Sequence, residues 1–221
     1  MLRRDGVDLS LDTGIFLGYA QEPAYEQQHD ACNRVFQSVA HRRFVSESVY
    51  AELSRRVRKR IELYAALVVH VAHGGKIDGF DLSPWNKSDA SLGRRIMREV
   101  ARAKPAPLLS YLRAERARFE ARVKEGLDRT ESSRIPQSGD DVLEAALNTI
   151  LAPADAGHLR DYLCWAASIG PTAFVTVDRG ILDARDRVLE IGRSHFDLTT
   201  ASWAVIHAAT LPERDGNQEA P

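Results

Sequence analysis

The chain has 221 residues, of which 44% are hydrophobic, and a formal net charge of −1, which suits one globular domain with a sizeable core. No apolar run approaches the roughly 18 residues that a membrane-spanning helix needs, which argues against an integral membrane protein. The first residues lack the apolar stretch of a signal peptide, so we expect a cytoplasmic protein with two free cysteine thiols.

The first part of the chain predicts strands alternating with helices. Residues before Asp12 alternate in polarity with period two, which is typical of a strand that ends at this acid. Ser46 is a suitable N-cap for a long helix, and Gly74 marks its end. In order, the predicted elements are a strand at 7–11, a helix at 24–40, a strand at 43–46 and a helix from 47 to about 73.

The middle of the chain predicts two charged helices, at 89–103 and 107–128, which are separated by Pro105 and Pro107. Arg, Glu and Ala are frequent in the second helix and favour that conformation. We therefore expect residues 61–139 to form a helical insertion in a domain that spans residues 1–211.

The last part of the chain returns to alternating strands and helices. The sequence predicts helices at 140–151 and 153–168, a strand at 173–177, a short helix, a strand at 188–191, a closing helix at 201–209 and a disordered tail at 212–221. This alternation predicts an α/β fold with a parallel sheet flanked by helices.

Two of the predicted strands are followed by a carboxylate. Asp12 follows the first strand, and Asp178 follows the strand at 173–177. Open α/β sheets bind ligands at the carboxyl ends of their strands, so these two acids indicate one shared acidic site.

Four motifs, in this order along the chain, resemble those of the PIN-domain nuclease family. They are Leu-Asp-Thr-Gly-Ile-Phe-Leu at 11–17, Val-Ser-Glu-Ser-Val-Tyr-Ala-Glu-Leu at 45–53, Asp-Ala-Gly-His-Leu-Arg-Asp at 155–161 and Phe-Val-Thr-Val-Asp-Arg at 174–179. The matched regions cover a little under half of the chain and leave its middle unmatched. The resemblance implies a three-layer PIN-like fold and metal-dependent hydrolysis of RNA. The family includes the VapC toxins, so the partners we consider are RNA, an antitoxin-like protein and a second copy of the chain.

On this resemblance the catalytic residues are Asp12, Glu52, Asp155 and Asp178, and the three aspartates bind Mg²⁺ or Mn²⁺. Physical chemistry supports the assignment, because such cations take oxygen ligands and converging carboxylates repel one another without a cation. Each acid also has a structural alternative. The aspartates that follow the strands could initiate turns, and Glu52, which flanks the buried face of its helix, could be a solvated residue.

The third acid of the site has two candidates on one helix. Asp155 and Asp161 are six residues apart, roughly 240° around the helix, so they point in different directions. Asp155 lies close to the apolar stripe of this helix, whereas Asp161 lies nearly opposite and is expected to be exposed. We therefore prefer Asp155 and keep Asp161 and Asp183 as alternates. His158 could contact substrate or only pack against neighbours.

The middle of the chain is basic although the net charge is close to zero. Residues 41–134 contain 21 Lys and Arg against 12 Asp and Glu. Arg94, Arg95 and Arg98 are therefore predicted to contact RNA phosphates, unless these bases pair with neighbouring acids. The alternative to an enzyme is an inactive PIN-like module that binds RNA or a protein through its basic helices. A single Asp-Thr-Gly and the predominance of helix argue against an aspartic protease.

Overall fold

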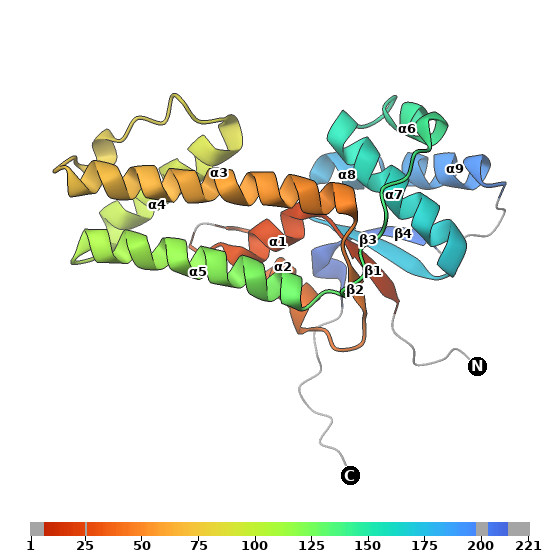
Figure 1. Ribbon diagram of the computed structural model, residues 1–221, viewed down its shortest axis with the longest axis horizontal. Helices are drawn as coiled ribbons and strands as arrows, with labels where there is room; N and C mark the ends of the chain where they lie inside the picture. The colour runs from red at the N-terminus through yellow and green to blue at the C-terminus, as the bar shows by residue number, and fades with distance from the viewer. Residues whose placement is uncertain (1–6, 25, 198–202, 212–221) are drawn as a thin grey trace, which may run out of the picture.

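A computed structural model describes residues 7–24, 26–197 and 203–211. Over these residues the chain is an α/β protein with four parallel strands, in the order β2-β1-β3-β4, which are flanked by helices (Figure 1). The strands are β1 (Asp8–Leu11), β2 (Arg43–Phe44), β3 (Thr172–Thr176) and β4 (Trp203–His207).

Helices make up most of the remaining described chain. They are α1 (Thr13–Ala20), α2 (His29–Gln37), α3 (Glu47–Ala72), α4 (Lys87–Ala103), α5 (Leu108–Asp128), α6 (Asp141–Leu147), α7 (Pro153–Ile169), α8 (Arg179–Asp183) and α9 (Arg185–His195), with the short 3-10 helices η1 (Ile77–Gly79) and η2 (Ala208–Thr210). The Ser46 side chain accepts a hydrogen bond from the Val49 amide (3.2 Å), which confirms Ser46 as the N-cap of α3.

Both faces of the sheet are covered, because side chains alternate along each strand. On β3, Ala173 and Val175 pack with the core formed by α1, α2, α3 and α5. Phe174 points to the other face and packs with α6, α7 and α9. The sheet therefore lies between two layers of helices, with a hydrophobic core on each side.

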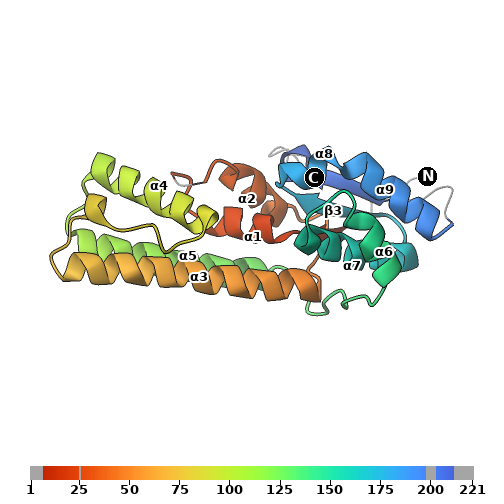
Figure 2. The ribbon, with the colours of Figure 1, turned by 90° about the horizontal axis from the view of Figure 1, so that it is seen from above.

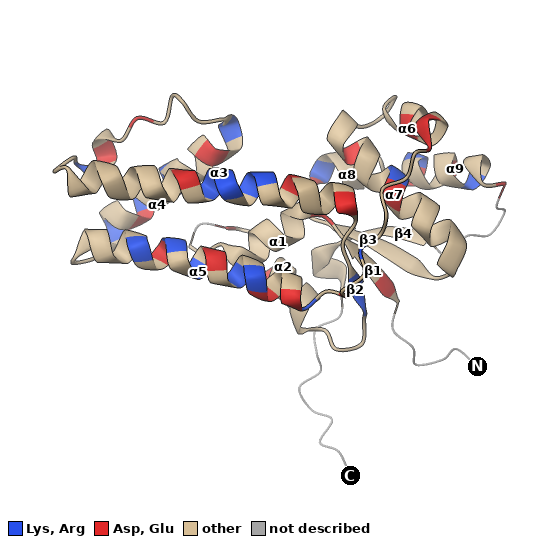
Figure 3. Ribbon diagram, in the orientation of Figure 1, with Lys and Arg blue, Asp and Glu red and all other residues tan. Residues whose placement is uncertain are grey.

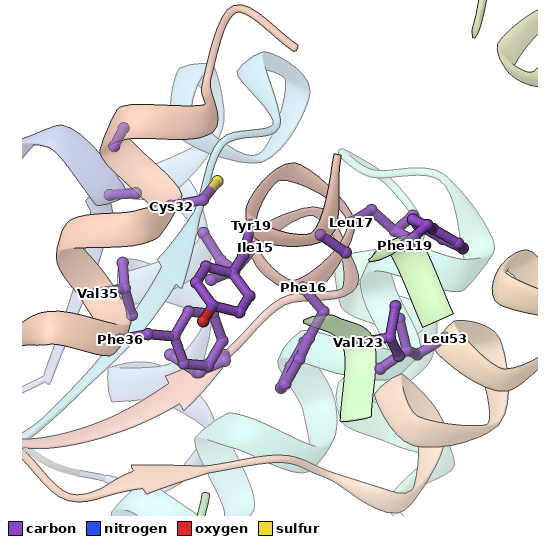
Figure 4. Close-up of a cluster of buried hydrophobic side chains, with 14 of the residues drawn as sticks. Ile15, Phe16, Leu17, Tyr19, Cys32, Val35, Phe36, Leu53, Phe119 and Val123 are labelled. Atoms are coloured by element: carbon purple, nitrogen blue, oxygen red, sulfur yellow. The ribbon is translucent and has the colours of Figure 1, made fainter. Parts of the chain in front are cut away.

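Helix α1 is the centre of the first core. Most of its residues are buried, because the helix lies between the sheet, α2 and the long helices α3 and α5. Figure 4 shows Phe16 and Tyr19 close to Phe36, and the Tyr19 and Phe36 ring centroids are 4.5 Å apart. This apolar helix follows Asp12 directly, so its packing fixes the position of Asp12 in the acidic site.

Helices α3 and α5 run side by side away from the sheet, and α4 packs beside them (Figures 1 and 2). Leu63 and Leu67 on α3, Ile96 on α4 and Phe119 on α5 are buried in this extension. It corresponds to most of the predicted helical segment 61–139. Because α3 is a continuous helix of 26 residues, it connects the edge of the sheet to the extension.

Two predicted elements near the C-terminus are wrong. Residues 188–191 belong to α9 and do not form a strand, because Val188 is buried against helices and β4 while the residues around it follow helical spacing. The predicted closing helix at 201–209 is instead β4 and η2, in its described part from residue 203. The predicted tail at 212–221 lies outside the described residues. Within the described chain, no helix is long and apolar enough to cross a membrane.

The close contact between α1 and α2 predicts a sensitive position at Gly18. A Cβ atom added to Gly18 would lie 2.5 Å from Sγ of the buried Cys32. We expect Gly18→Ala to lower the free energy of unfolding by about 1–3 kcal/mol, the usual range for overpacking. Gly157→Ala is the matched control, because an added Cβ in this helical position meets no atom within 4 Å and removes a flexible residue. In urea unfolding, Gly18→Ala should be less stable than Gly157→Ala. Equal stabilities of the two variants would contradict the close contact between α1 and α2.

Candidate acidic site

Asp12 lies in the turn between β1 and α1, at the edge where the parallel strands end. Its amide donates to the Val175 carbonyl (3.0 Å), which holds it beside the end of β3. The buried side chain caps no helix but accepts a hydrogen bond from the Thr176 hydroxyl (2.7 Å). The pKa of Asp12 is raised to about 6, mainly by burial and also by the charges of Glu52 and Asp178, against the hydrogen bond from Thr176. The turn-initiating alternative therefore does not account for its side chain.

Glu52, in the second turn of α3, is turned towards Asp12. Its Oε2 accepts a hydrogen bond from the Thr13 hydroxyl (2.8 Å), and its Oε1 accepts one from Arg56 Nε (2.7 Å). Burial opposes ionisation, but the Thr13 hydrogen bond and the positive charge of Arg56 lower the pKa of Glu52 overall. Only 9% of the side chain is exposed, so Glu52 is not a solvated helix residue.

His158 lies between these two acids. Its Nδ1 is 3.8 Å from Asp12 Oδ1, and its Nε2 is 3.4 Å from Glu52 Oε2. Burial lowers the pKa of His158, against the opposing effects of Glu52 and Asp155. Its buried Nδ1 has no hydrogen-bond partner in the described structure. Because the ring is enclosed by carboxylates, its contact with them is established, whereas a contact with substrate stays a prediction.

Asp155 lies in the first turn of α7, one turn before His158. Its pKa is raised to about 6, first by burial and then by the negative charges of Asp178 and Asp12. The same neighbours thus act on Asp155 and on Asp12, which indicates that the acids from β1, α7 and the end of β3 share one electrostatic environment.

Asp178 is the exposed member of the group and has a structural role. Its Oδ1 caps α8 by accepting hydrogen bonds from the Gly180 amide (2.7 Å) and the Ile181 amide (3.3 Å). Its own amide donates to Thr176 Oγ1 (2.9 Å), the hydroxyl that donates to Asp12. Within the described chain, Oδ2 of Asp178 has no hydrogen-bond partner, so one carboxylate oxygen is free for a ligand.

The expectation that Asp161 is exposed is wrong. Asp161 is fully buried, and its Oδ1 accepts hydrogen bonds from Arg160 (2.7 and 3.0 Å) and from the Ser138 amide (2.9 Å). The segment between α5 and α6 covers this face of α7, where Ser138 contacts Asp161 and Cys164. Asp161 therefore belongs to a structural ion pair. The other alternate, Asp183, is exposed at the end of α8.

The three predicted substrate-binding arginines differ in their surroundings on α4. Arg94 and Arg98 are exposed and line one pocket. Arg95 is half-buried, with its guanidinium 3.7 Å from Glu26. Arg95 therefore pairs with a neighbouring acid, which is the alternative to RNA binding, whereas Arg94 and Arg98 can reach a ligand.

Sequence reasoning missed the two threonines that organise the acids. Thr13 fixes Glu52, and Thr176 connects Asp12 with the turn at Asp178. The sequence carries a weak signal for both, since each is a small polar residue within two positions of an acid at the end of a strand.

In the described part of the chain, no three His, Cys, Asp or Glu side chains are arranged so that they could hold a metal ion. The donors at this edge nevertheless fit a hard cation in chemistry. They are carboxylate oxygens, and Mg²⁺ in proteins needs one or two of them, because water and phosphate oxygens complete its coordination. The raised pKa values of Asp12 and Asp155 also mean that their charges lack compensation, which a cation would supply.

Three comparisons with known proteins return nothing: no protein-family model, no curated protein and no solved structure matches the chain.

Proposed function

We propose that the chain is a Mg²⁺- or Mn²⁺-dependent ribonuclease with a PIN-like fold, whose catalytic residues are Asp12, Glu52, Asp155 and Asp178. The observation that carries the proposal is the mutual electrostatic effect of these acids at the carboxyl edge of a parallel sheet, where burial and neighbouring charge raise the pKa of Asp12 and Asp155 to about 6. The four motifs that resemble the PIN-domain family support the same reading.

Each residue has a distinct role in this proposal. Asp12, Asp155 and Asp178 would hold the cation, which polarises a phosphodiester and lowers the pKa of an attacking water. Glu52 is kept ionised by Thr13 and Arg56, so its carboxylate can accept a proton from that water. His158 is buried and fills the space between Asp12 and Glu52, at 3.8 Å and 3.4 Å from their carboxylates.

The basic helices supply binding in the same proposal. Arg94 and Arg98 are exposed on α4 and would neutralise RNA phosphates, which makes affinity depend strongly on salt. An acidic antitoxin-like protein or a second copy of the chain could cover the same helices, and both stay predictions.

Replacing Glu52 distinguishes a ribonuclease from an inactive module that only binds RNA or a protein. We expect Glu52→Gln to slow RNA cleavage about 100-fold, because the amide still accepts a hydrogen bond from Thr13 but cannot take up a proton. The measurement is the rate at saturating single-stranded RNA with Mg²⁺, with EDTA as the metal-free reference.

Glu47→Gln is the matched control for this experiment, because Glu47 is an exposed residue of the same helix. It should cut RNA at close to the wild-type rate. If wild type binds RNA but does not cut it with either metal, the inactive module replaces the nuclease.

A further inference from the structure

A basic pocket of about 300 Å³ lies between α3 and the start of α4, separate from the acidic site. Figure 3 shows the Lys and Arg residues that gather in the middle of α3. The pocket is lined by Arg55, Arg56, Lys59, Arg60, Asn86, Ser88 and Asp89. The lining thus contains four cationic side chains and one carboxylate, although Arg55 and Arg56 also contact Glu52 and Lys59 also contacts Glu62 outside it.

Arg60 is the unusual member of this lining. Only 7% of the residue is exposed, and its Nη1 has no hydrogen-bond partner among the described residues. Burial lowers the pKa of its guanidinium, while Asp89 and Glu26 raise it, yet arginine stays charged in proteins. A buried charged N–H group without an acceptor is costly, so the pocket favours a ligand that brings oxygen atoms and negative charge.

The N-terminus of α4 contributes to the same pocket. This helix has 17 residues, and its cap Asn86 accepts a hydrogen bond from the Asp89 amide (3.0 Å). Asn86 Nδ2 also donates to Asp89 (2.6 Å), which engages the one acid of the lining. The other amides of this first turn, including that of Ser88, carry the partial positive charge with which helix N-termini bind phosphate.

The pocket is connected to the acidic site through α3. Arg56, which lines the pocket, is hydrogen-bonded to Glu52 (2.7 Å). Lys59 follows Glu52 by seven residues, which is roughly 11 Å along a helix. Since phosphates repeat about every 3.4 Å along a stacked strand, an RNA strand reaches from one site to the other within a few nucleotides.

We propose that this pocket binds a backbone phosphate of the RNA substrate, a few nucleotides from the bond that is cut at the acidic site. The inference rests on the proposed function for the identity of the ligand. The pocket then fixes the register of the strand, while the acids perform the reaction.

A single added charge tests the pocket without disturbing the fold. Ser88 is exposed in the first turn of α4, where an acid is favourable for the helix, so Ser88→Glu should fold normally while it repels a phosphate. Ser110→Glu is the matched control, because Ser110 is exposed in the first turn of α5 and does not line the pocket. Arg55→Glu is a second exposed variant of the lining.

Binding is measured by fluorescence anisotropy with a labelled 12-nucleotide RNA in EDTA, for the full chain over a range of salt concentrations. Relative to Ser110→Glu, we expect Ser88→Glu and Arg55→Glu to weaken binding at least about tenfold. The log–log salt slope should decrease by about 0.7, the value for one phosphate contact on a single strand. With Mg²⁺, the KM of Ser88→Glu should rise by a similar factor while its kcat stays within about twofold; Arg55→Glu is compared in binding only, because Arg55 lies 3.8 Å from the catalytic Glu52.

Equal binding by Ser88→Glu and Ser110→Glu would overturn the inference, even if the wild type cuts RNA. If instead the two pocket variants lose RNA binding but the wild type never cuts RNA, the pocket is supported and the ribonuclease is rejected. Competition with inorganic phosphate and with ADP separates the sources of the phosphate. If RNA displaces bound inorganic phosphate or bound ADP, the proposal is supported. If inorganic phosphate binds and RNA does not displace it, the proposal is contradicted.

Discussion

Asp12→Asn is expected to abolish RNA cleavage, with a loss of at least about 1,000-fold, and at the same time to make the metal-free protein more stable. The variant loses the most buried anion of the site, and with it the affinity for the cation. The amide oxygen still accepts the hydrogen bond from Thr176, so the turn after β1 is preserved. Loss of activity with gain of stability is typical of a functional site and not of a structural residue.

The stability gain depends on pH in a defined way. Asp12 has a pKa of about 6 in the folded chain and 3.8 in the unfolded reference, so the folded state binds the proton more tightly. Its ionisation therefore lowers stability as the pH rises from about 4 to about 6, and the full cost remains above that range. A shift of about two units corresponds to at most about 3 kcal/mol. We expect Asp12→Asn to gain about 1–3 kcal/mol at pH 8 and little at pH 4.

Thermal unfolding at pH 4 and pH 8, with EDTA and with Mg²⁺, measures this effect. Mg²⁺ should raise the Tm of wild type at pH 8 more than that of Asp12→Asn, because the cation compensates the buried carboxylate. Asp183→Asn is the control, since Asp183 is an exposed acid on a neighbouring helix. An Asp12→Asn variant that cuts RNA at the wild-type rate would place the chemistry elsewhere.

The elements predicted correctly from the sequence are those with strong local signals. The strand before Asp12 and the strand at 173–177 contain β-branched and apolar residues that end in a polar turn, and the long helix has a serine cap and a glycine stop. The segment 188–191 has no such signal. Its apolar residues fit a strand and one face of a helix equally well, and its contacts in the second core favour α9.

Strand β4 could not be predicted because both of its faces are covered. Trp203 and Val205 pack into one core while Ala204 and Ile206 pack into the other, so the strand shows no alternation of polarity. Its pairing partner β3 is distant in the sequence but adjacent in the sheet. Periodicity cannot distinguish such a short apolar run from a buried helix segment, although Trp203, Val205 and Ile206 favour a strand.

The candidate site shows the same division between local and non-local information. Glu52 lies beside the buried face of its helix as its spacing predicts, and Asp155 lies in the environment of the other acids. The burial of Asp161 depends on a segment more than 20 residues earlier, where the Ile135 amide donates to the Val45 carbonyl (3.1 Å) and Ser138 reaches α7. Helical periodicity contains no information about such a covering segment.

Asp161→Ala is expected to destabilise the fold more than any other acidic substitution considered above. Arg160 is 5% exposed and Asp161 is fully buried, so the pair lies away from solvent. Removal of one partner from a buried pair costs about 3–5 kcal/mol, because the remaining charge is left without compensation. Glu144 also contacts Arg160, which places the expected loss near the lower end of this range. Asp161→Asn should lose less, since its amide oxygen can still accept the Ser138 hydrogen bond.

Urea unfolding at pH 7 measures this loss, and Asp183→Ala is the exposed control that should stay within about 0.5 kcal/mol of wild type. RNA cleavage by the folded fraction decides between the two acids of α7. If Asp161 is structural, the folded Asp161→Asn variant cuts RNA at nearly the wild-type rate, whereas Asp155→Asn is slowed at least about 100-fold. The reverse order of the two rates, with the stability of Asp161→Asn unchanged, would assign the third catalytic position to Asp161. We expect Asp155→Asn to be the slower variant because Asp161 is paired with Arg160, whereas the pKa of Asp155 is raised by burial and by the charges of Asp178 and Asp12.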